Sequence, residues 1–365
     1  MRKRLAVIIV LVFLVASGFL VRDLFRPFKG YAARQIVDIS RGSNAFRIAN
    51  LLVSKGVLRN RLPFLALYLI GRYRYRLEAG EYLFDRPLRP LDVYRKLIHG
   101  QVYLHTVVIP EGSNRFDMAR IYHQDLGIPE REFLAATLQT RAISDLDPQA
   151  PSLEGYLFPD TYRFPRSATV AQIIASMLNQ FRKIYRNDLA GELQKSGLTL
   201  HQAVTLASMV ERETPKPSER PIIAQVFELR LEIGMPLESD PTVFYAEARA
   251  GHPVQTLTKQ DLQFGSPYNT YAHAGLPPGP ICSPGQASLQ AALCPASTDY
   301  LYFVSNNHGG HVFARTLAQH ERNVARYRQQ LTALRLAGEQ RRRKKLRAPP
   351  SVRLRRRVNR RLHPQ

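Results

Sequence analysis

The longest hydrophobic segment of the chain lies near its N-terminus, directly after the residues MRKR. Residues 5–21 (LAVIIVLVFLVASGFLV) contain no charged side chain. A helix of this length, at 1.5 Å per residue, spans roughly 25 Å, the short end of a membrane crossing. A cleaved signal peptide is the alternative, but the segment is longer than the usual apolar core of one and no A-x-A site follows it. We therefore predict an uncleaved transmembrane helix over residues 5–21.

Basic residues flank this segment on both sides and bear on its orientation. The RKR sequence at residues 2–4 favours a cytoplasmic N-terminus, whereas the basic residues within 22–29 weaken that preference. We predict a cytoplasmic stub of residues 1–4, a linker over residues 22–34 and an extracytoplasmic location for the bulk of the chain. No second apolar segment is long enough to span, so the sequence predicts a single-pass protein.

Short strands and short amphipathic helices alternate over residues 35–110. The pattern predicts a strand at 36–39, a helix from Ser43 to Gly56, a helix over 62–69, a strand at 80–84, a helix over 90–98 and a strand at 102–109. Pro90 suits the first turn of its helix, and Gly100 suits the residue after the end. This alternation is typical of a small α+β module.

Helical periodicity dominates residues 111–336, beyond a boundary at PEGS (110–113). Between residues 170 and 185 apolar residues recur at i, i+3, i+4, i+7, i+8, i+11, i+14 and i+15, one broad stripe of an amphipathic helix. Further elements are predicted from Thr199 to before Pro215, from Ser218 to Gly234, from Gln286, over the strand 300–304, and from Leu317 to about Leu336. The predicted fold class is therefore α+β: a transmembrane helix, a small α+β module and a mainly helical α+β domain.

The composition is that of a folded chain with a large positive charge. Hydrophobic residues make up 45% and charged residues 22%, which excludes a wholly disordered protein. The 52 Lys and Arg residues against 29 Asp and Glu give a net charge of +23, and residues 341–365 hold twelve of the basic residues. Nucleic acid, lipid headgroups and wall polymers all attract such a surface. Because the chain lacks a recognisable nucleic-acid fold, we predict no nucleic-acid partner and a disordered basic tail over 337–365 that contacts lipid or wall polymer.

Histidines and cysteines give little sign of a metal or redox centre. His308, His311 and His320 lie near one another in sequence without clustered carboxylates, and no HExxH motif occurs. Cys282 and Cys294 either pair or remain free thiols, and the sequence leaves both alternatives open. No P-loop, dinucleotide fingerprint or G-x-S-x-G elbow occurs. We expect no metal and no cofactor.

Carboxylates beside aromatic residues are the remaining candidates for chemistry. They occur in EGYLFPDTY (154–162) and in SMVERET (208–214). Sugar rings stack on flat apolar faces while carboxylates bind hydroxyls or transfer protons, so this combination suits a carbohydrate. Glu211 and Glu213 are two residues apart, which places them about 200° apart around a helix. They are therefore not a pair that shares one site.

Several blocks punctuated by glycine and proline resemble the MltG/YceG-like endolytic murein transglycosylases. They are EGYLFPDTY, ASMVERET, ESDPTVFYA (238–246), SPYNTY (266–271), GLPPGPICSPG (275–285), PASTDYLYFV (295–304) and GGHVFARTLAQH (309–320). Their order matches from about residue 36 to residue 330. The resemblance implies a LysM-like module over 35–110, a catalytic domain over 111–336, and an enzyme of the bacterial inner membrane that cuts peptidoglycan glycan strands.

The resemblance also implies the residues of the site. The catalytic acid of the family, the second glutamate of its E-[KR]-E-T segment, falls on Glu213, and Glu211 is a candidate supporting residue. The residues expected to line the substrate groove are Glu154, Asp160, Tyr162, Tyr268, Asn269 and Tyr271. Core packing is the alternative role for Tyr162. Peptidoglycan synthases or division proteins are further expected partners, although no residue identifies them.

The implied reaction is that of a carbon–oxygen lyase acting on polysaccharide. A glutamic acid with a raised pKa protonates the departing oxygen of the MurNAc–GlcNAc bond. The same carboxylate then takes the proton of the C6 hydroxyl of MurNAc, whose oxygen attacks its own anomeric carbon and leaves a 1,6-anhydro end. Asn269, nearby tyrosine hydroxyls and Glu154 are candidates to stabilise the charge on the sugar. The competing hypothesis is a non-catalytic peptidoglycan-binding scaffold of the cell envelope.

Overall fold

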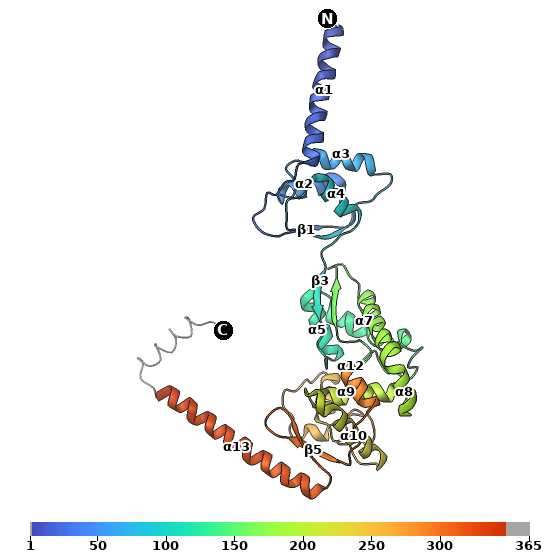
Figure 1. Ribbon diagram of the computed structural model, residues 1–365, viewed down its shortest axis with the longest axis vertical. Coiled ribbons are helices and arrows are strands. Elements are labelled where there is room, and N and C mark those ends of the chain that lie inside the picture. The colour runs from blue at the N-terminus through green and yellow to red at the C-terminus, as the bar shows by residue number, and fades with distance from the viewer. Residues whose placement is uncertain (1, 348–365) are drawn as a thin grey trace. The chain divides into compact units, whose positions relative to one another are not determined.

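The computed structural model describes residues 2–347 (Figure 1), and its contacts divide the chain into two units. Unit 1 comprises the chain up to Ile109 together with Met118–Phe133 and Asp160–Ile173. Unit 2 comprises Pro110–Asp117, Leu134–Pro159 and the chain from Ile174 onward. Each unit therefore consists of separate stretches of the sequence. A single boundary at residue 110 does not divide the chain in this way.

Unit 1 begins with the apolar helix α1 (Arg2–Phe25). Within it, Val7–Phe25 is long and apolar enough to cross a membrane, judged by length and composition. The helix runs past the predicted end at Val21, because the first proline of the chain is Pro27. A proline also disfavours helical backbone at the residue before it, which agrees with an end at Phe25.

A module of short strands and helices follows α1 (Figure 1). Its elements are β1 (Gln35–Ile39), α2 (Ala45–Ser54), α3 (Leu62–Gly71), β2 (Gly80–Phe84) and α4 (Pro90–Ile98). The strands pair antiparallel with Val37 opposite Tyr82, and both side chains are buried. Side chains from all five elements meet in one hydrophobic core, among them Val37, Leu52, Phe64, Tyr82 and Leu97. The module thus has a core of its own.

The start of α2 shows how a cap fixes a helix boundary. The apolar pattern predicts a start at Ser43, whereas the helix begins at Ala45. The side chain of Asn44 is the N-cap and accepts a hydrogen bond from the amide of Arg47 at 2.8 Å. A cap of this kind satisfies one of the free amides of the first turn, so Asn44 sets the boundary.

A second antiparallel pair of strands belongs to unit 1. Strand β3 (His105–Val108) pairs with β4 (Thr161–Phe164) and is shorter than the predicted strand 102–109. Tyr162 and Phe164 point to the buried side of β4, and their rings stack with centroids 5.9 Å apart. Helices α5 (Arg115–Leu126) and α6 (Glu130–Ala136) contribute residues to both units.

Unit 2 is mainly helical, with α9 as its most buried helix. After α7 (Val170–Ile184), the elements are the π-helical turn η2 (Tyr185–Leu189), α8 (Ala190–Ser196), α9 (Leu200–Glu213), α10 (Arg220–Glu232), α11 (Asp240–Arg249), α12 (Gln286–Leu293), β5 (Tyr302–Ser305), β6 (His311–Ala314) and α13 (Leu317–Arg347). The short 3-10 turns are η1 (Thr140–Ala142), η3 (Pro217–Glu219) and η4 (Asp261–Gln263). Helix α9 contacts α10, α11 and α12, and every residue from Ala203 to Val210 is buried. A helix enclosed in this way is a rigid support for the residue at its end.

The C-terminal helix is longer than the sequence pattern predicts. Helix α13 continues past Leu336 to Arg347, so residues 337–347 of the basic tail are helical where we expected disorder. Arginine, lysine, glutamine and leucine favour helices, and after Gly338 the next helix breaker is Pro349. Residues 348–365 lie outside the described residues, so their disorder stays a prediction.

The two cysteines are free thiols, which settles the alternative that the sequence left open. Cys282 is buried, and its Sγ lies 3.2 Å from the carbonyl oxygen of Ser208 in α9. Cys294 is exposed, with its Sγ 3.4 Å from the carboxylate of Glu192. Hydrogen bonds to Ser208, and not a disulfide bond, therefore connect the Pro-rich segment to α9.

Candidate active site

Helix α9 positions the candidate acid. The helix begins at a capping box, in which the side chain of Thr199 accepts the amide of Gln202 and the side chain of Gln202 accepts the amide of Thr199. It ends at Glu213 because Thr214 adopts an extended conformation before Pro215. A buried helix with a fixed start and a fixed end thus carries a glutamate as its last residue.

Glu213 lies in surroundings that favour its neutral form. The side chain is partly exposed, yet burial of the carboxyl group raises its pKa to about 7. The hydrogen bond from Ser239 opposes this rise, the nearby charge of Asp240 adds to it, and the charges of Arg230 and Arg212 oppose it. The partial negative charge at the C-terminus of a helix also disfavours a carboxylate there. Both protonation states are therefore accessible near neutral pH.

The hydrogen-bond partner of Glu213 is Ser239, whose Oγ donates to Oε1 of the glutamate at 2.5 Å. The amide of Ser239 donates to Oγ1 of Thr270 at 3.0 Å, and Oγ1 of Thr242 donates to the carbonyl of Ser239 at 2.6 Å. Ser239, Thr242 and Thr270 are all buried. The backbone of Ser239 is therefore held in place by two of the sequence blocks, ESDPTVFYA and SPYNTY.

The loop before α11 is fastened by the guanidinium group of Arg230 in α10. Nη1 of Arg230 donates to the carbonyls of Pro236 and Leu237 at 3.1 and 3.0 Å, and Nε donates to the carbonyl of Leu301 at 2.7 Å. The next residue, Glu238, has a φ angle of +50°, a conformation that residues other than glycine seldom adopt. Such backbone persists only where its surroundings hold it, and it clusters at functional sites.

Tyr271 and Asp240 form a second polar pair in the electrostatic surroundings of Glu213. The hydroxyl of Tyr271 donates to Oδ1 of Asp240 at 2.6 Å. Burial, the hydrogen bond to Asp240, and the charges of Asp240, Glu238 and Glu213 raise the pKa of Tyr271 far above its ordinary value. The phenol therefore stays protonated. The structure thus brings the predicted residues Glu213 and Tyr271 together and adds Asp240 to them.

Glu211 has a different set of contacts. Its Oε1 lies 3.0 Å from Nη2 of Arg220, the first residue of α10, and its Oε2 accepts the amide of Gly285 at 3.0 Å. The side chains of Glu211 and Arg220 are only 5% and 8% exposed. Removing one partner of a buried ion pair leaves the other uncompensated, so these contacts are structural. Glu211 fastens α9 to α10 and to the start of α12, in keeping with a supporting role.

Glu154 is buried within unit 2, with 1% of its surface exposed. Its two carboxylate oxygens accept the amide of Arg115, the first residue of α5, at 3.1 and 3.0 Å. Burial raises its pKa to about 7, while the hydrogen bonds from Arg115 and from the Tyr245 hydroxyl oppose that rise. A carboxylate at a helix N-terminus satisfies amides that lack a partner in the helix. These contacts favour a cap for α5 over the predicted contact with substrate.

Asn269 and Tyr268 were also expected to line the groove, and both are buried. Nδ2 of Asn269 donates to the carbonyls of Leu262 and Phe264 at 3.0 and 2.9 Å, and its Oδ1 accepts the amide of Tyr271 at 3.0 Å. The amide group of Asn269 therefore braces the loop that presents Tyr271. The predicted contacts of Asn269 and Tyr268 with substrate stay predictions.

Asp160 and Tyr162 belong to unit 1, whereas Glu213 belongs to unit 2. Tyr162 lies on β4 with 9% of its surface exposed, and burial raises the pKa of its hydroxyl. Asp160 precedes the strand, and its Oδ1 accepts the amide of Thr161 at 2.6 Å. The structure thus places them on another unit, and their contact with substrate stays a prediction.

Ser239, Asp240 and Arg230 are candidate site residues that the sequence analysis did not single out. Ser239 and Asp240 lie in the ESDP segment, where Pro241 occupies the first turn of α11. A serine and an acid before such a proline mark a helix start, and this signal was present in the sequence. Arg230 gave no signal, because its partners include backbone carbonyls that only the folded chain brings together.

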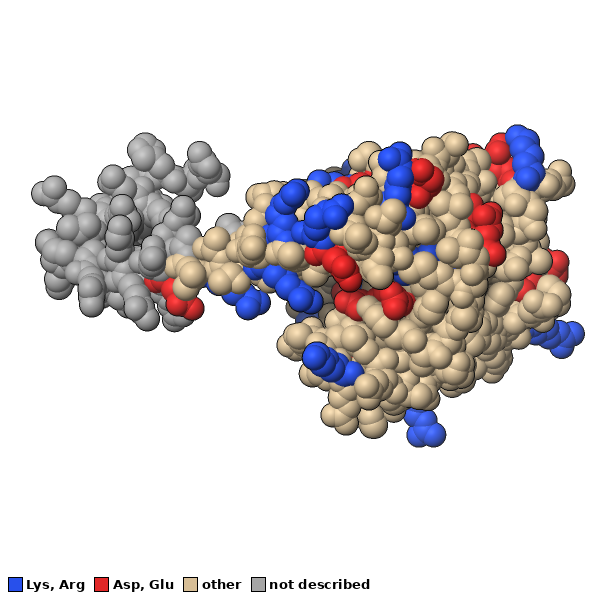
Figure 2. Space-filling model, turned by 90° about the horizontal axis from the view of Figure 1, so that it is seen from below, with Lys and Arg blue, Asp and Glu red and all other residues tan. Residues whose placement is uncertain are grey.

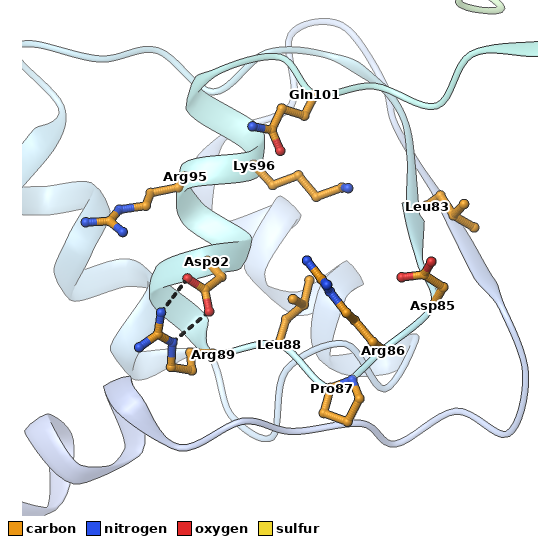
Figure 3. A pocket seen from close by; sticks show the side chains of 10 residues that line it. All are labelled: Leu83, Asp85, Arg86, Pro87, Leu88, Arg89, Asp92, Arg95, Lys96 and Gln101. Carbon is orange, nitrogen blue, oxygen red and sulfur yellow. Dashed lines mark hydrogen bonds and ion pairs between the residues drawn. The ribbon is translucent and has the colours of Figure 1, made fainter.

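A cavity of about 860 Å³ in the module of unit 1 has a different chemistry (Figure 3). Its lining residues are Leu83, Asp85, Arg86, Pro87, Leu88, Arg89, Asp92, Arg95, Lys96 and Gln101. Hydrogen bonds from Arg89 at 2.7 and 2.9 Å lower the pKa of Asp92, so this carboxylate is ionised at neutral pH. It is therefore unsuited to donate a proton.

Within residues 2–347, no group of three or more His, Cys, Asp and Glu side chains is placed to hold a metal ion.

The fold and the site define a protein of mixed helices and sheets with a carboxyl group of raised pKa, that of Glu213, at the end of a buried helix. The YceG-like family matches residues 37–326, and the chain belongs to that family, which confirms the resemblance seen in the sequence. A crystal structure of a putative YceG-like protein from Listeria monocytogenes is similar, with a TM-score of 0.56 and 30% identity, over 80% of this chain and 98% of that one.

Two curated relatives carry the name endolytic murein transglycosylase. The one from Bacillus subtilis (strain 168) is 32% identical over 307 residues, which cover 80% of this chain and 84% of the relative. The one from Streptococcus pneumoniae serotype 2 (strain D39 / NCTC 7466) is 29% identical over 354 residues, which cover 88% of this chain and 64% of the relative. The likeness therefore extends over most of the chain, including the segments that surround Glu213.

Proposed function

We propose that this chain is a membrane-anchored endolytic murein transglycosylase that cleaves MurNAc–GlcNAc bonds without water and leaves 1,6-anhydro-MurNAc ends. The observation that carries the proposal is Glu213, a carboxyl group with a pKa raised to about 7 that Ser239 holds at the end of a buried helix. The names of the relatives in B. subtilis and S. pneumoniae support peptidoglycan as the substrate.

Glu213 acts first as a general acid. Because its pKa is raised to about 7, a substantial fraction of the enzyme keeps the carboxyl proton at neutral pH. This proton passes to the glycosidic oxygen as the bond from that oxygen to C1 of MurNAc breaks. The hydroxyl of Ser239 then stabilises the carboxylate that remains, because a donor favours the ionised form. General acid catalysis of this kind contributes roughly 10²–10⁴-fold to the rate.

Glu213 acts next as a general base. The carboxylate accepts the proton of the C6 hydroxyl of the same MurNAc residue, and the C6 oxygen forms a bond to C1. Glu213 thereby recovers the proton that it gave up, and no water is consumed. Because nucleophile and electrophile belong to one sugar, the effective concentration is high. A second catalytic carboxylate, as glycoside hydrolases require, is not needed for this route.

The positive charge that develops on the sugar requires negative charge nearby. Asp240 raises the pKa of Glu213, so its charge lies close to the reacting group, and the half-exposed Glu238 precedes it in the same loop. We assign this role to these two acids instead of Asn269 and Glu154. Asp240 and Glu238 flank Ser239, the hydrogen-bond partner of Glu213. The carboxylate of Glu154 is instead buried on the amide of Arg115, and the amide of Asn269 is bonded to backbone groups.

We assign the chain to the inner membrane, with its bulk on the extracytoplasmic side. The apolar helix over Val7–Phe25 and the basic residues 2–4 support this assignment. In this layout residues 35–110 form the LysM-like module, residues 111–336 the catalytic domain, and glycan strands next to the membrane the substrate. Peptidoglycan synthases or division proteins are the partners expected for an enzyme at this place.

Replacement of Glu213 by glutamine tests the proposal. Glutamine is nearly isosteric and still accepts the hydrogen bond from Ser239, so Glu213→Gln should fold like the wild type. Formation of products with 1,6-anhydro ends should fall by roughly 10²-fold or more, because the amide neither donates nor accepts the proton. The measurement is mass analysis of the fragments that the full-length protein in detergent releases from purified sacculi.

Glu232→Gln is the matched control, because it changes an exposed glutamate at the end of α10. This variant should release anhydro products at the rate of the wild type. Wild-type turnover by Glu213→Gln would refute the role of Glu213. Products with reducing ends from the wild type would instead identify a hydrolase, and binding to sacculi without any product would identify the non-catalytic scaffold.

A further inference from the structure

Helix α3 leaves an apolar face uncovered. On one side of the helix Phe64 is fully buried, with its ring packed edge-on against that of Tyr94. On the other side Leu62, Leu69 and Ile70 are 62%, 57% and 84% exposed. These three residues lie at i, i+7 and i+8 and therefore share one face of the helix. A helix on the surface of a module is expected to be polar on its outer side, and α3 is not.

Arginines and tyrosines border this apolar face. Residues 72–76 (RYRYR) follow α3 directly and are all exposed, with Tyr73 88% exposed, and Arg59 and Arg61 precede the helix. Residues 59–76 contain five arginines and no acidic residue. Tyrosine rings are enriched at the headgroup level of membranes, and arginines pair with lipid phosphates. The combination is typical of a segment that lies in the plane of a membrane interface.

The position of α3 agrees with such a location. Helix α1 contacts both α3 and α4, and Nδ2 of Asn60 donates to Oδ2 of Asp23 near the end of α1 at 3.1 Å. Figure 1 shows α3 running across the C-terminal end of α1. The candidate span ends at Phe25. The uncovered face of α3 therefore lies at the level where the hydrocarbon around α1 would give way to lipid headgroups.

We infer that residues 59–76, which we name the interfacial surface, dock on the outer leaflet of the bilayer that α1 crosses. Leu62, Leu69 and Ile70 enter the upper acyl region, and the arginines contact lipid phosphates. The inference rests on the proposed anchoring by α1. A lipid surface is favoured over a protein partner because the face continues from the span and its charge is uniformly positive. Docking holds the module against the membrane instead of letting it move freely about the end of α1.

The absence of tryptophan from the chain provides a direct test. A single tryptophan introduced by Ile70→Trp reports only on its own surroundings. The full-length variant is placed in nanodiscs of phosphatidylcholine and phosphatidylglycerol with brominated acyl chains, because bromine quenches an indole that enters the acyl region. We expect quenching at position 70 to exceed that of Leu138→Trp, an exposed site on unit 2, by roughly twofold or more.

A second control separates this inference from the proposed anchor. Phe13→Trp places the probe inside the candidate span. Quenching at positions 13 and 70 supports docking. Quenching at 13 with none at 70 overturns docking and leaves the anchor intact. This holds even if the indole of I70W is shielded from iodide in the water, because a protein partner and not lipid then covers it. No quenching at 13 refutes the anchor, and the docking inference falls with it.

The arginines supply an independent readout. In the I70W background, replacement of Arg72, Arg74 and Arg76 by glutamine should lower the quenching. The loss should be larger in nanodiscs rich in phosphatidylglycerol than in neutral ones, because the attraction is electrostatic. Equal quenching with and without the three arginines in anionic nanodiscs would contradict the assigned role of these side chains.

Discussion

Ser239 and burial act on Glu213 in opposite directions. Burial disfavours the charged form and raises the pKa to about 7, whereas the hydroxyl of Ser239 donates to the carboxylate and lowers it. Because Thr242 and Thr270 hold Ser239 on a buried network, this donor is available without reorganisation when Glu213 ionises. The carboxyl group is thereby balanced between giving and taking a proton, which the proposed reaction requires of it in turn.

Ser239→Ala should move the pH profile of the reaction. Loss of the donor raises the pKa of Glu213, and the acid step requires the protonated form. The value of kcat/KM falls as the pH rises through that pKa, so this alkaline limb should shift upward by about 0.5–1 pH unit. The measurement is the rate of anhydro-product formation between acidic and alkaline pH.

Ser239→Thr keeps the hydroxyl and should return the alkaline limb toward that of the wild type. If Ser239→Ala lowers the rate equally at every pH without moving the limb, Ser239 serves only to build the loop. The pH profile is therefore the readout that separates tuning of Glu213 from a purely structural role.

At this scale the sequence pointed to Glu213 as the candidate acid but gave no indication of its surroundings. Resemblance of the ERET segment assigned the role to Glu213, and helical spacing predicted that Glu211 faces elsewhere, in agreement with its ion pair to Arg220. The groups that act on Glu213 include the hydroxyl of Ser239 and the charges of Asp240 and Arg230, which lie in other segments of the chain. No local pattern reports contacts of that kind, because folding alone brings the segments together.

Helices were predicted well where the sequence contains residues that mark both the start and the end of the helix. Helix α4 covers residues 90–98 as predicted, because Pro90 occupies its first turn and Gly100 follows its end. Helix α11 was not predicted, since its polar residues obscure the apolar period and its burial depends on contacts from other segments. The partner of β3 was equally hidden, because β4 follows only after two helices.

Gly155 is a position at which the fold tolerates no side chain. Its φ angle is +85°, and an added Cβ would lie 2.6 Å from the side chain of Pro280 and 2.8 Å from that of Val204 in α9. Gly155→Ala should therefore lower the free energy of unfolding by about 2 kcal/mol or more, through backbone strain and overpacking. Chemical denaturation of the full-length protein in detergent measures the change.

Gly191→Ala is the control for this prediction. Gly191 lies within α8, and an added Cβ there meets no atom within 4 Å. Because alanine favours a helix over glycine, the substitution should raise the free energy of unfolding by roughly 0.5–1 kcal/mol. A loss of stability at Gly191, or none at Gly155, would show that close packing around Gly155 is not what requires glycine.

For the whole molecule, the uneven placement of charge matters more than its sum. On the face seen in Figure 2, acidic and basic side chains are interspersed over the folded part. Residues 341–365, by contrast, hold twelve basic residues and no acid, and so carry about half of the chain's net charge of +23. The strongest attraction to anionic polymers is therefore expected from the end of the chain and not from the body.

Ending the chain after Gln340 removes those twelve positive charges. The shortened protein should bind purified sacculi more weakly at low salt and lose less binding when the salt is raised, because fewer screened contacts remain. Co-sedimentation with sacculi at low and high salt measures this, with the intact chain as reference. Identical salt dependence of the two proteins would show that the tail makes no electrostatic contact with the wall.

The hydrogen bond from Arg230 to the carbonyl of Leu301 connects the surroundings of Glu213 to a segment that holds no reacting group. Leu301 stands at the entrance of the β5–β6 hairpin, far along the chain from Glu213 and Ser239. A fragment that stops ahead of this hairpin would keep every reacting group, yet Nε of the buried Arg230 would lose its acceptor. The shortest fragment expected to act as an enzyme on its own therefore extends beyond the reacting residues and includes the β5–β6 hairpin.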